Sequence, residues 1–164
     1  MHNKFSSSPL SRDHLQAIGD IIRQSLGETF RTLFHVDLNC DELRQHGKVP
    51  ADAFICRANL SQEDRKISLF FSFDKLLLRV LLEDIYPAEL LQDPMVYSDA
   101  ASEIANIVGN NVKKYLNEHG FHLLLDIPYV EKQMPPKEEC VHLHFSLENA
   151  HLYVDMIADS AAIA

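Results

Sequence analysis

The stretch Ser98-Asp99-Ala100-Ala101-Ser102-Glu103-Ile104-Ala105-Asn106 opens the second of two long helical patterns in this chain. Apolar residues recur from here to about His119 at the three- and four-residue steps of a helix that buries one face. The predicted buried side consists of Ala101, Ile104, Ile107, Val108, Val112, Tyr115 and Leu116. Gly120 follows as the expected C-terminal stop. We therefore predict a long amphipathic helix that begins at Ser98 or Asp99.

The same helix is expected to carry a polar stripe. Helical spacing gathers Asp99, Glu103, Asn106 and Asn110 on one side, with Asp99 expected in the first turn, where its charge favours the helix dipole. A carboxylate and a carboxamide three residues apart offer a partner both a charge and orientable hydrogen bonds. A solvated helix face has the same pattern, so the stripe is either a binding surface or ordinary surface.

Two further helices are predicted before this one. The first runs from about Leu10 to Phe34 with Ser11 as its N-cap, and the second from Asp74, again a cap, to Ile85. Pro87 is expected to end the second helix and Pro94 to close the loop that follows.

Six segments have the composition of strands. They are residues 36–43, 54–60, 66–73, 122–130, 140–147 and 151–157, and the second and third are joined by a polar turn typical of a hairpin. A long helix followed by strands occurs twice in this order. We predict an α+β fold, with a mainly antiparallel sheet covered by the two long helices.

Composition limits the class of protein. A chain of 164 residues with 46% apolar content fits one compact domain over 1–164, for which we expect flexible ends at 1–10 and 159–164. A net charge of −9 argues against nucleic acid as a partner. We expect a cytoplasmic protein without membrane contact, because no secretory signal or membrane-length apolar run is visible. Cys40, Cys56 and Cys140 are too few and too scattered for a disulfide framework.

A longer pattern includes the polar stripe. The motif Asp99-x3-Glu103-x2-Asn106 is followed, after 21 intervening residues, by Pro128 in a predicted strand. This pattern resembles the signature of the CheC/CheX/FliY family of chemotaxis phosphatases, and the order of the predicted hairpin, short helix, motif helix and closing strands agrees with it. The first long helix contains no Glu-x2-Asn, so the resemblance is greatest to the CheX branch. Gly109 departs from the family pattern, because Asn110 stands where the glycine commonly falls.

The resemblance implies an enzyme that hydrolyses the phospho-aspartate of a CheY-type response regulator in chemotaxis or two-component signalling. Asn106 would orient the attacking water, and Glu103 would pair with a lysine of the regulator. Asp99 and Asn110 would help to bind the partner, whereas Pro128 would only shape its strand. The chain itself would bind no cofactor, and Mg²⁺ would belong to the partner's active site. The resemblance also implies a homodimer formed by sheet edges, provided by the closing strands or by the hairpin.

Two alternatives remain open. A non-catalytic module of the same fold could bind a response regulator or act as a scaffold without turnover. A histidine metal site is also conceivable, because His142 and His144 would project from one face of a strand while His119 and His122 flank a turn. No aspartate or glutamate stands at a telling distance from these histidines, so we expect no metal site.

Overall fold

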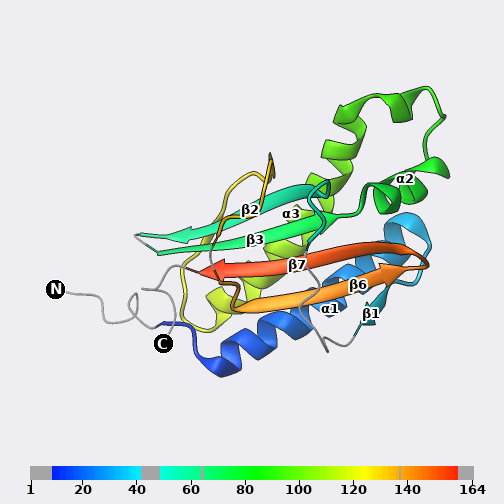
Figure 1. The fold of residues 1–164 in the computed structure, drawn as a ribbon. Helices are drawn as coiled ribbons and strands as arrows, with labels where there is room; N and C mark the ends of the chain where they lie inside the picture. Colours follow the sequence, from blue (N-terminus) through cyan, green and yellow to red (C-terminus); the bar gives the residue numbers. More distant parts are fainter. Residues whose placement is uncertain (1–8, 42–48, 64, 137, 159–164) are drawn as a thin grey trace.

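Seven strands form one sheet in the computed structural model, which describes residues 9–41, 49–63, 65–136 and 138–158 (Figure 1). The strand order is β1-β6-β7-β3-β2-β4, β5 also pairs with β2, and every pairing is antiparallel. The strands are β1 Asn39–Asp41, β2 Phe54–Gln62, β3 Arg65–Phe73, β4 Leu124–Leu125, β5 Tyr129–Glu131, β6 Val141–Leu147 and β7 Ala150–Ala158. The helices are α1 Arg12–Phe34, α2 Lys75–Glu83, the short 3-10 helix η2 Leu90–Gln92 and α3 Pro94–Glu118. The predicted α+β class is confirmed.

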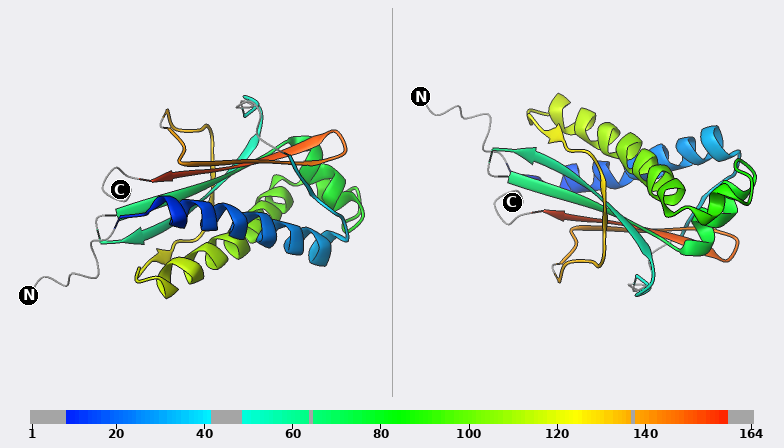
Figure 2. Two further views of the ribbon diagram at one scale, coloured as in Figure 1. Left: turned by 90° about the horizontal axis from the view of Figure 1, so that it is seen from below. Right: turned by 90° about the horizontal axis from the view of Figure 1, so that it is seen from above.

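The two long helices α1 and α3 lie on one face of the sheet, as the two views of Figure 2 show. Side chains alternate between the two faces of a strand, and the face toward the helices carries the larger apolar core. The sheet residues of this core are Cys56, Ala58, Leu60, Ile67, Leu69, Phe71, Phe73, Leu143, Phe145, Ala150, Leu152, Val154 and Met156. The predicted covering of the sheet by two long helices is confirmed.

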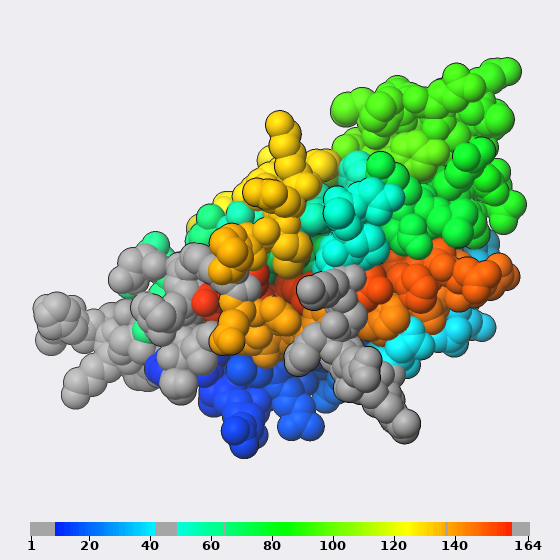
Figure 3. Space-filling model, viewed as in Figure 1, coloured from blue at the N-terminus to red at the C-terminus, as the bar shows by residue number. Residues whose placement is uncertain are grey.

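The face away from the helices carries the buried polar side chains Asn59, Ser68, Ser72 and Asp155, and Figure 3 looks toward this side of the molecule. A small apolar cluster of Ile55, Phe70 and Ile157 is covered there by Met134, from the connection between β5 and β6. Histidines of β6 and β7 occupy the rest of the face near β1. The two faces of the sheet therefore have different chemistry.

Helix caps follow the sequence closely. Ser11 caps α1 and forms a reciprocal capping box with His14, and the Asp74 side chain accepts from the backbone N–H of Leu76 at the start of α2. Gly120 follows α3 with a positive φ of 96°, a conformation that costs glycine little. These local signals were predicted correctly.

The predicted start of α3 is wrong by about one turn. The helix begins at Pro94, and the side chain of Asp93 caps it by accepting from the backbone N–H of Met95. Proline at the first helical position loses no hydrogen bond, because that N–H has no partner within a helix. Asp99 therefore lies in the second turn, beyond the reach of the dipole at the helix end.

The predicted strand over 122–130 is interrupted. Only Leu124–Leu125 and Tyr129–Glu131 pair with β2, and Pro128 lies between these two short strands rather than within one. Proline has no N–H to give to a ladder, which agrees with a break at this position. In the predicted strand 36–43, the described part contains β1 alone, and residues 42 and 43 lie outside the described residues.

Most of the strands expected to form a dimer edge are internal. β7 lies between β6 and β3, and β2 and β3 each have neighbours on both sides. β6 is an exception, since β1 covers only residues 144–146 of it, opposite Asp41, Cys40 and Asn39. Among the described residues, the outer side of Val141–Leu143 is therefore an open stretch of edge.

The chain ends and the cysteines complete the description. Of the ends expected to be flexible, 1–8 and 159–164 lie outside the described residues, whereas Leu10 is buried in the core. All three cysteines are free thiols. Within the part of the chain that the structure describes, no helix is both long and apolar enough to cross a membrane.

Candidate functional site

The polar stripe of α3 faces outward, as expected from its spacing. Ala101, Ile104, Ala105, Val108 and Val112 bury the opposite side of the helix against the sheet. Asp99, Glu103 and Asn110 are exposed, and Asn106 is half-buried. The structure therefore brings all four predicted residues to one side of a helix that is firmly seated on its apolar face.

The side chains of Glu103 and Asn106 bind no other described residue of the chain. Among the described residues, neither the carboxylate of Glu103 nor the side-chain amide of Asn106 forms a hydrogen bond or an ion pair, and the same holds for the carboxylate of Asp99. A carboxamide has two N–H donors and an acceptor oxygen, so Asn106 retains its full capacity to bind another molecule. The two side chains lie one helical turn apart and can act together on one partner.

Asn110 differs from Asn106. Its side-chain N–H donates to the backbone carbonyl of Asn106 over 3.0 Å, as asparagine within a helix commonly does. This bond occupies one donor of Asn110 and leaves its oxygen exposed. Asn110 can therefore contribute to a contact surface, but it is less available than Asn106.

Apolar side chains border the carboxylates of the stripe. Asp99 and Glu103 line an open hollow where the ends of α1 and α2 approach α3, together with Leu33, Phe34, Leu82, Ile85, Tyr86 and Ala100. Ile85 is 49% exposed and Tyr86 40% exposed. Apolar side chains beside unpaired charges are typical of protein-binding surfaces. Sequence reasoning missed this border, although the exposed pair Ile85-Tyr86 between α2 and Pro87 was a visible signal.

Gly109 holds α3 close to the sheet. A Cβ at this position would come within 3.1 Å of Leu125 Cδ1 in β4, which is tighter than an ordinary contact. The glycine thus allows the helix to approach β4 next to Asn106. A glycine at position 109 is therefore explained by the close packing of α3 against β4. Pro128 lies between β4 and β5 and is not part of the polar stripe.

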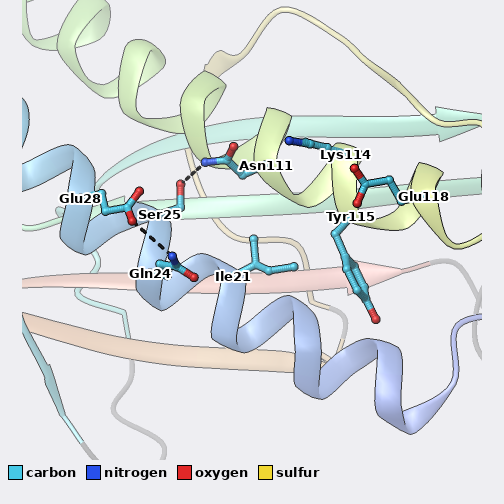
Figure 4. Close-up of a pocket in the computed structure, with 8 residues that line it drawn as sticks. All are labelled: Ile21, Gln24, Ser25, Glu28, Asn111, Lys114, Tyr115 and Glu118. Atoms are coloured by element: carbon cyan, nitrogen blue, oxygen red, sulfur yellow. Dashed lines mark hydrogen bonds between the residues drawn. The ribbon is translucent and has the colours of Figure 1, made fainter.

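A second hollow lies between α1 and α3, farther toward the C-terminal end of α3 (Figure 4). There the Asn111 side chain donates to Ser25 Oγ over 2.7 Å, and Gln24 donates to Glu28 over 3.2 Å. These groups satisfy one another within the chain. These polar side chains are therefore bonded within the chain, in contrast to Glu103 and Asn106 of the stripe.

Cys56 lies in β2 beneath α3 and is an unsuitable nucleophile. Its Sγ is 3.8 Å from Ser102 Oγ, and burial raises the pKa of this thiol to about 11. A thiol with such a pKa stays protonated near neutral pH and reacts slowly. The site has no activated cysteine among the described residues.

Three histidines, His142, His144 and His151, gather on the opposite face of the sheet. His142 contacts Asp155, and His144 Nε2 is 2.8 Å from His151 Nδ1. Burial lowers the pKa of His144, and the nearby Asp41 opposes that shift. Burial likewise raises the pKa of Asp155, an effect that its contact with His142 opposes. These groups lie on the other side of the sheet from α3 and take no part in the stripe.

Comparison with solved structures identifies the fold. The chain superimposes on the chemotaxis protein CheX from Vibrio vulnificus with a TM-score of 0.67 and 18% identity, covering 87% of this chain and 99% of that one. A CheC-like superfamily protein from Shewanella sp. PV-4 gives a TM-score of 0.69 and 16% identity, with coverages of 87% and 97%. The CheX–CheY–BeF3–Mg²⁺ complex from Borrelia burgdorferi gives a TM-score of 0.67 and 14% identity, with coverages of 86% and 97%.

No protein-family model matches the sequence, and no curated protein matches it either. The structural likeness spans almost the whole length of CheX and CheC-like proteins at low sequence identity. The chain therefore has the CheC-like fold, and the resemblance noted from its sequence is confirmed at the level of the fold.

Proposed function

We propose that this chain is a phosphatase that removes the phosphoryl group from the phospho-aspartate of a CheY-type response regulator. One observation carries the proposal. Glu103 and Asn106 project from an exposed helix without any partner among the described residues, in a chain whose fold matches CheX proteins. The Borrelia burgdorferi relative in this fold is a complex of CheX with CheY, BeF3 and Mg²⁺.

The reaction requires little from the phosphatase. Water attacks phosphorus, a new P–O bond forms, and the bond to the aspartyl oxygen breaks to give a carboxylate and inorganic phosphate. An acyl phosphate already has a good leaving group, so positioning of the water is the main contribution. Asn106 performs this step by accepting a hydrogen bond from the water and donating to an adjacent oxygen. Mg²⁺ in the regulator's own active site neutralises the phosphoryl charge.

Glu103 acts as an anchor. Its carboxylate pairs with a lysine in the partner's site and fixes the register of the two proteins. Asp99 lies one turn farther from Asn106 and adds negative charge at the rim. The exposed side chains Leu33, Ile85 and Tyr86 supply the apolar part of the contact.

The chain also acts as a homodimer in this proposal, joined through an edge of the sheet. Among the strands that the sequence offers as a dimer edge, β6 has a stretch, Val141–Leu143, whose outer side pairs with no described residue. This surface lies on a strand that is not in contact with the stripe, so a dimer would leave both copies of Glu103 and Asn106 free.

The test is phosphate release from a panel of phosphorylated receiver domains. The wild-type chain is expected to accelerate release from its cognate receiver, whereas Asn106→Ala should lose at least about 100-fold of this acceleration. Gln24→Ala on α1 is the control, because it removes a carboxamide from the exposed side of the other long helix, and it should retain full activity. Acceleration that survives in Asn106→Ala would contradict the proposed role. Tight binding without acceleration by the wild type would instead identify a non-catalytic binding module.

A further inference from the structure

The polar face of the sheet brings together two histidines and an aspartate from three strands. Asp41 comes from β1, His144 from β6 and His151 from β7, and one ligand atom of each lies within 4.8 Å of the others. Asp41 stands directly opposite His144 in the β1–β6 pairing. His151 is the diagonal neighbour of His144, two residues before Tyr153, which is paired with it. All three therefore project from the same face.

His144 lies at the centre of the cluster and faces its two neighbours through different ring nitrogens. His144 Nε2 and His151 Nδ1 are 2.8 Å apart, and Asp41 Oδ2 lies 3.5 Å from His144 Nδ1. Two imidazole nitrogens on one tetrahedral zinc ion lie about 3.3 Å apart, given Zn–N distances of about 2.0–2.1 Å. The two rings would separate by about half an ångström to admit the ion. Asp41 faces Nδ1 of His144, so its carboxylate must turn toward the Nε2 side of the ring to share an ion with the two histidines. Its present contact is too long for a strong hydrogen bond and does not hold it in place.

Packing holds the rings in place. The ring of His144 stacks on Tyr153 with centroids 4.6 Å apart and planes 4° from parallel, and His151 packs at a tilt against the same tyrosine. All three candidate ligands are half-buried, so the site is braced from beneath and still open to solvent. Because packing already restricts the rings of His144 and His151, these side chains lose little conformational entropy when a metal binds.

We propose that Asp41, His144 and His151 bind one divalent transition-metal ion of the zinc class. Two imidazoles and one carboxylate are a ligand set that such ions favour, with the fourth position left to water. The bound ion would tie the three-residue strand β1 to β6 and β7. The site lies on the face of the sheet opposite α3, so this inference is independent of the phosphatase proposal.

A neighbouring cluster of Glu139, His142 and Asp155 is the competing location. Asp155 is buried and His142 half-buried, and the two already contact each other, whereas Glu139 is exposed. This second cluster offers one imidazole instead of two and a less accessible position. The set containing His144 and His151 is therefore the better match to a zinc-class ion.

The test uses the full-length chain without a histidine tag, after removal of metal with a chelator. Titration with zinc chloride, followed by calorimetry, should give one ion per chain with a Kd of about 10 µM or tighter. Saturating zinc should also raise the thermal unfolding temperature, because the ion binds the folded state. His144→Asn and His151→Asn should each weaken binding at least about tenfold, and Asp41→Asn should weaken it as well.

His122→Asn is the matched control, since His122 is exposed near β4 at the opposite edge of the sheet, and it should bind zinc like the wild type. Cobalt gives a readout that needs no variant, because coordinated imidazoles show paramagnetically shifted NMR signals, and two histidines are expected. The proposal is overturned if zinc binding is absent, if it survives in His144→Asn and His151→Asn, or if His142→Asn alone abolishes it. If zinc binding is absent, His144 and His151 form only a hydrogen bond with each other.

Discussion

The two long helices, α1 and α3, lie side by side on one face of the sheet but use their polar side chains differently. On α1, Asp20 pairs with Arg23 at 2.8 Å and Gln24 donates to Glu28 at 3.2 Å. On α3, Glu103 and Asn106 are left without such partners among the described residues. Helical spacing alone cannot separate a solvated face from a binding face. At these positions the polar side chains of α1 are bonded to one another, whereas those of Glu103 and Asn106 on α3 are not.

The largest difference between the two helices is expected when a charge is reversed on each of them and binding to a receiver is measured. Glu103→Lys is expected to weaken the complex with an activated receiver by about 2 kcal/mol, roughly 30-fold in Kd, because it places a cation against the partner's lysine. Glu28→Lys on α1 makes the same change of charge outside the proposed contact and should alter Kd much less. Binding measured by calorimetry at two salt concentrations checks both variants. Equal losses for Glu103→Lys and Glu28→Lys would point to a general effect of net charge.

The second prediction concerns the packing of α3 against β4 at Gly109. Gly109→Val should lower the free energy of unfolding by about 2 kcal/mol, because the added side chain meets Leu125 in β4. Chemical denaturation measures this loss. The double variant Gly109→Val with Leu125→Ala removes the obstructing side chain and should recover part of the stability. No recovery would show that the close approach to β4 is not the reason for the glycine.

The third prediction is the corresponding change on α1, with the opposite sign. A Cβ at Gly19 would meet only the end of the flexible Arg23 side chain, at 3.6 Å. Gly19→Ala should therefore raise the free energy of unfolding by about 0.5–1 kcal/mol, since alanine favours a helix over glycine. Denaturation of this variant beside wild type gives the difference. A destabilised Gly19→Ala protein would mean that α1 packs more tightly than its contacts indicate.

The last prediction concerns Cys56 and is a change of stability that occurs only above about pH 9. Burial raises the pKa of its thiol from 9.0 to about 11, so the folded state holds the proton more tightly than the unfolded state. This contribution to stability is fully present below pH 9 and is lost as pH rises toward about 11. Stability of the wild type should thus fall relative to Cys56→Ala over this range. Parallel curves for the two proteins would contradict the shift.

Much of the fold could be predicted because its signals are local. The caps Ser11 and Asp74, the hairpin and the apolar face of α3 all depend on residues close together in the sequence. The start of α3 is harder to predict, because proline is common both at the end of a loop and at the first position of a helix, and only the cap Asp93 before Pro94 distinguishes the two. The break at Pro128 was missed because the apolar residues around it resemble one continuous strand.

The predicted site residues on α3 came out on one exposed side for the same reason, since helical spacing alone places them. The groups around them depend on tertiary structure. Ile85 and Tyr86 reach the hollow beside Glu103 only because α2 ends against α3. Asp41 meets His144 only through the register of β1 on β6, which no spacing in the sequence reveals.

The most direct measurement follows the side-chain amide of Asn106 by NMR while the chain is titrated with a beryllofluoride-activated, Mg²⁺-loaded receiver domain. The account predicts that the Asn106 NH₂ signals shift and become protected from solvent exchange. The amides of Gln24 and Asn111, which are engaged within the chain, should stay unchanged. If Asn106 does not respond while the complex forms, its side chain does not enter the partner's site and the central claim fails.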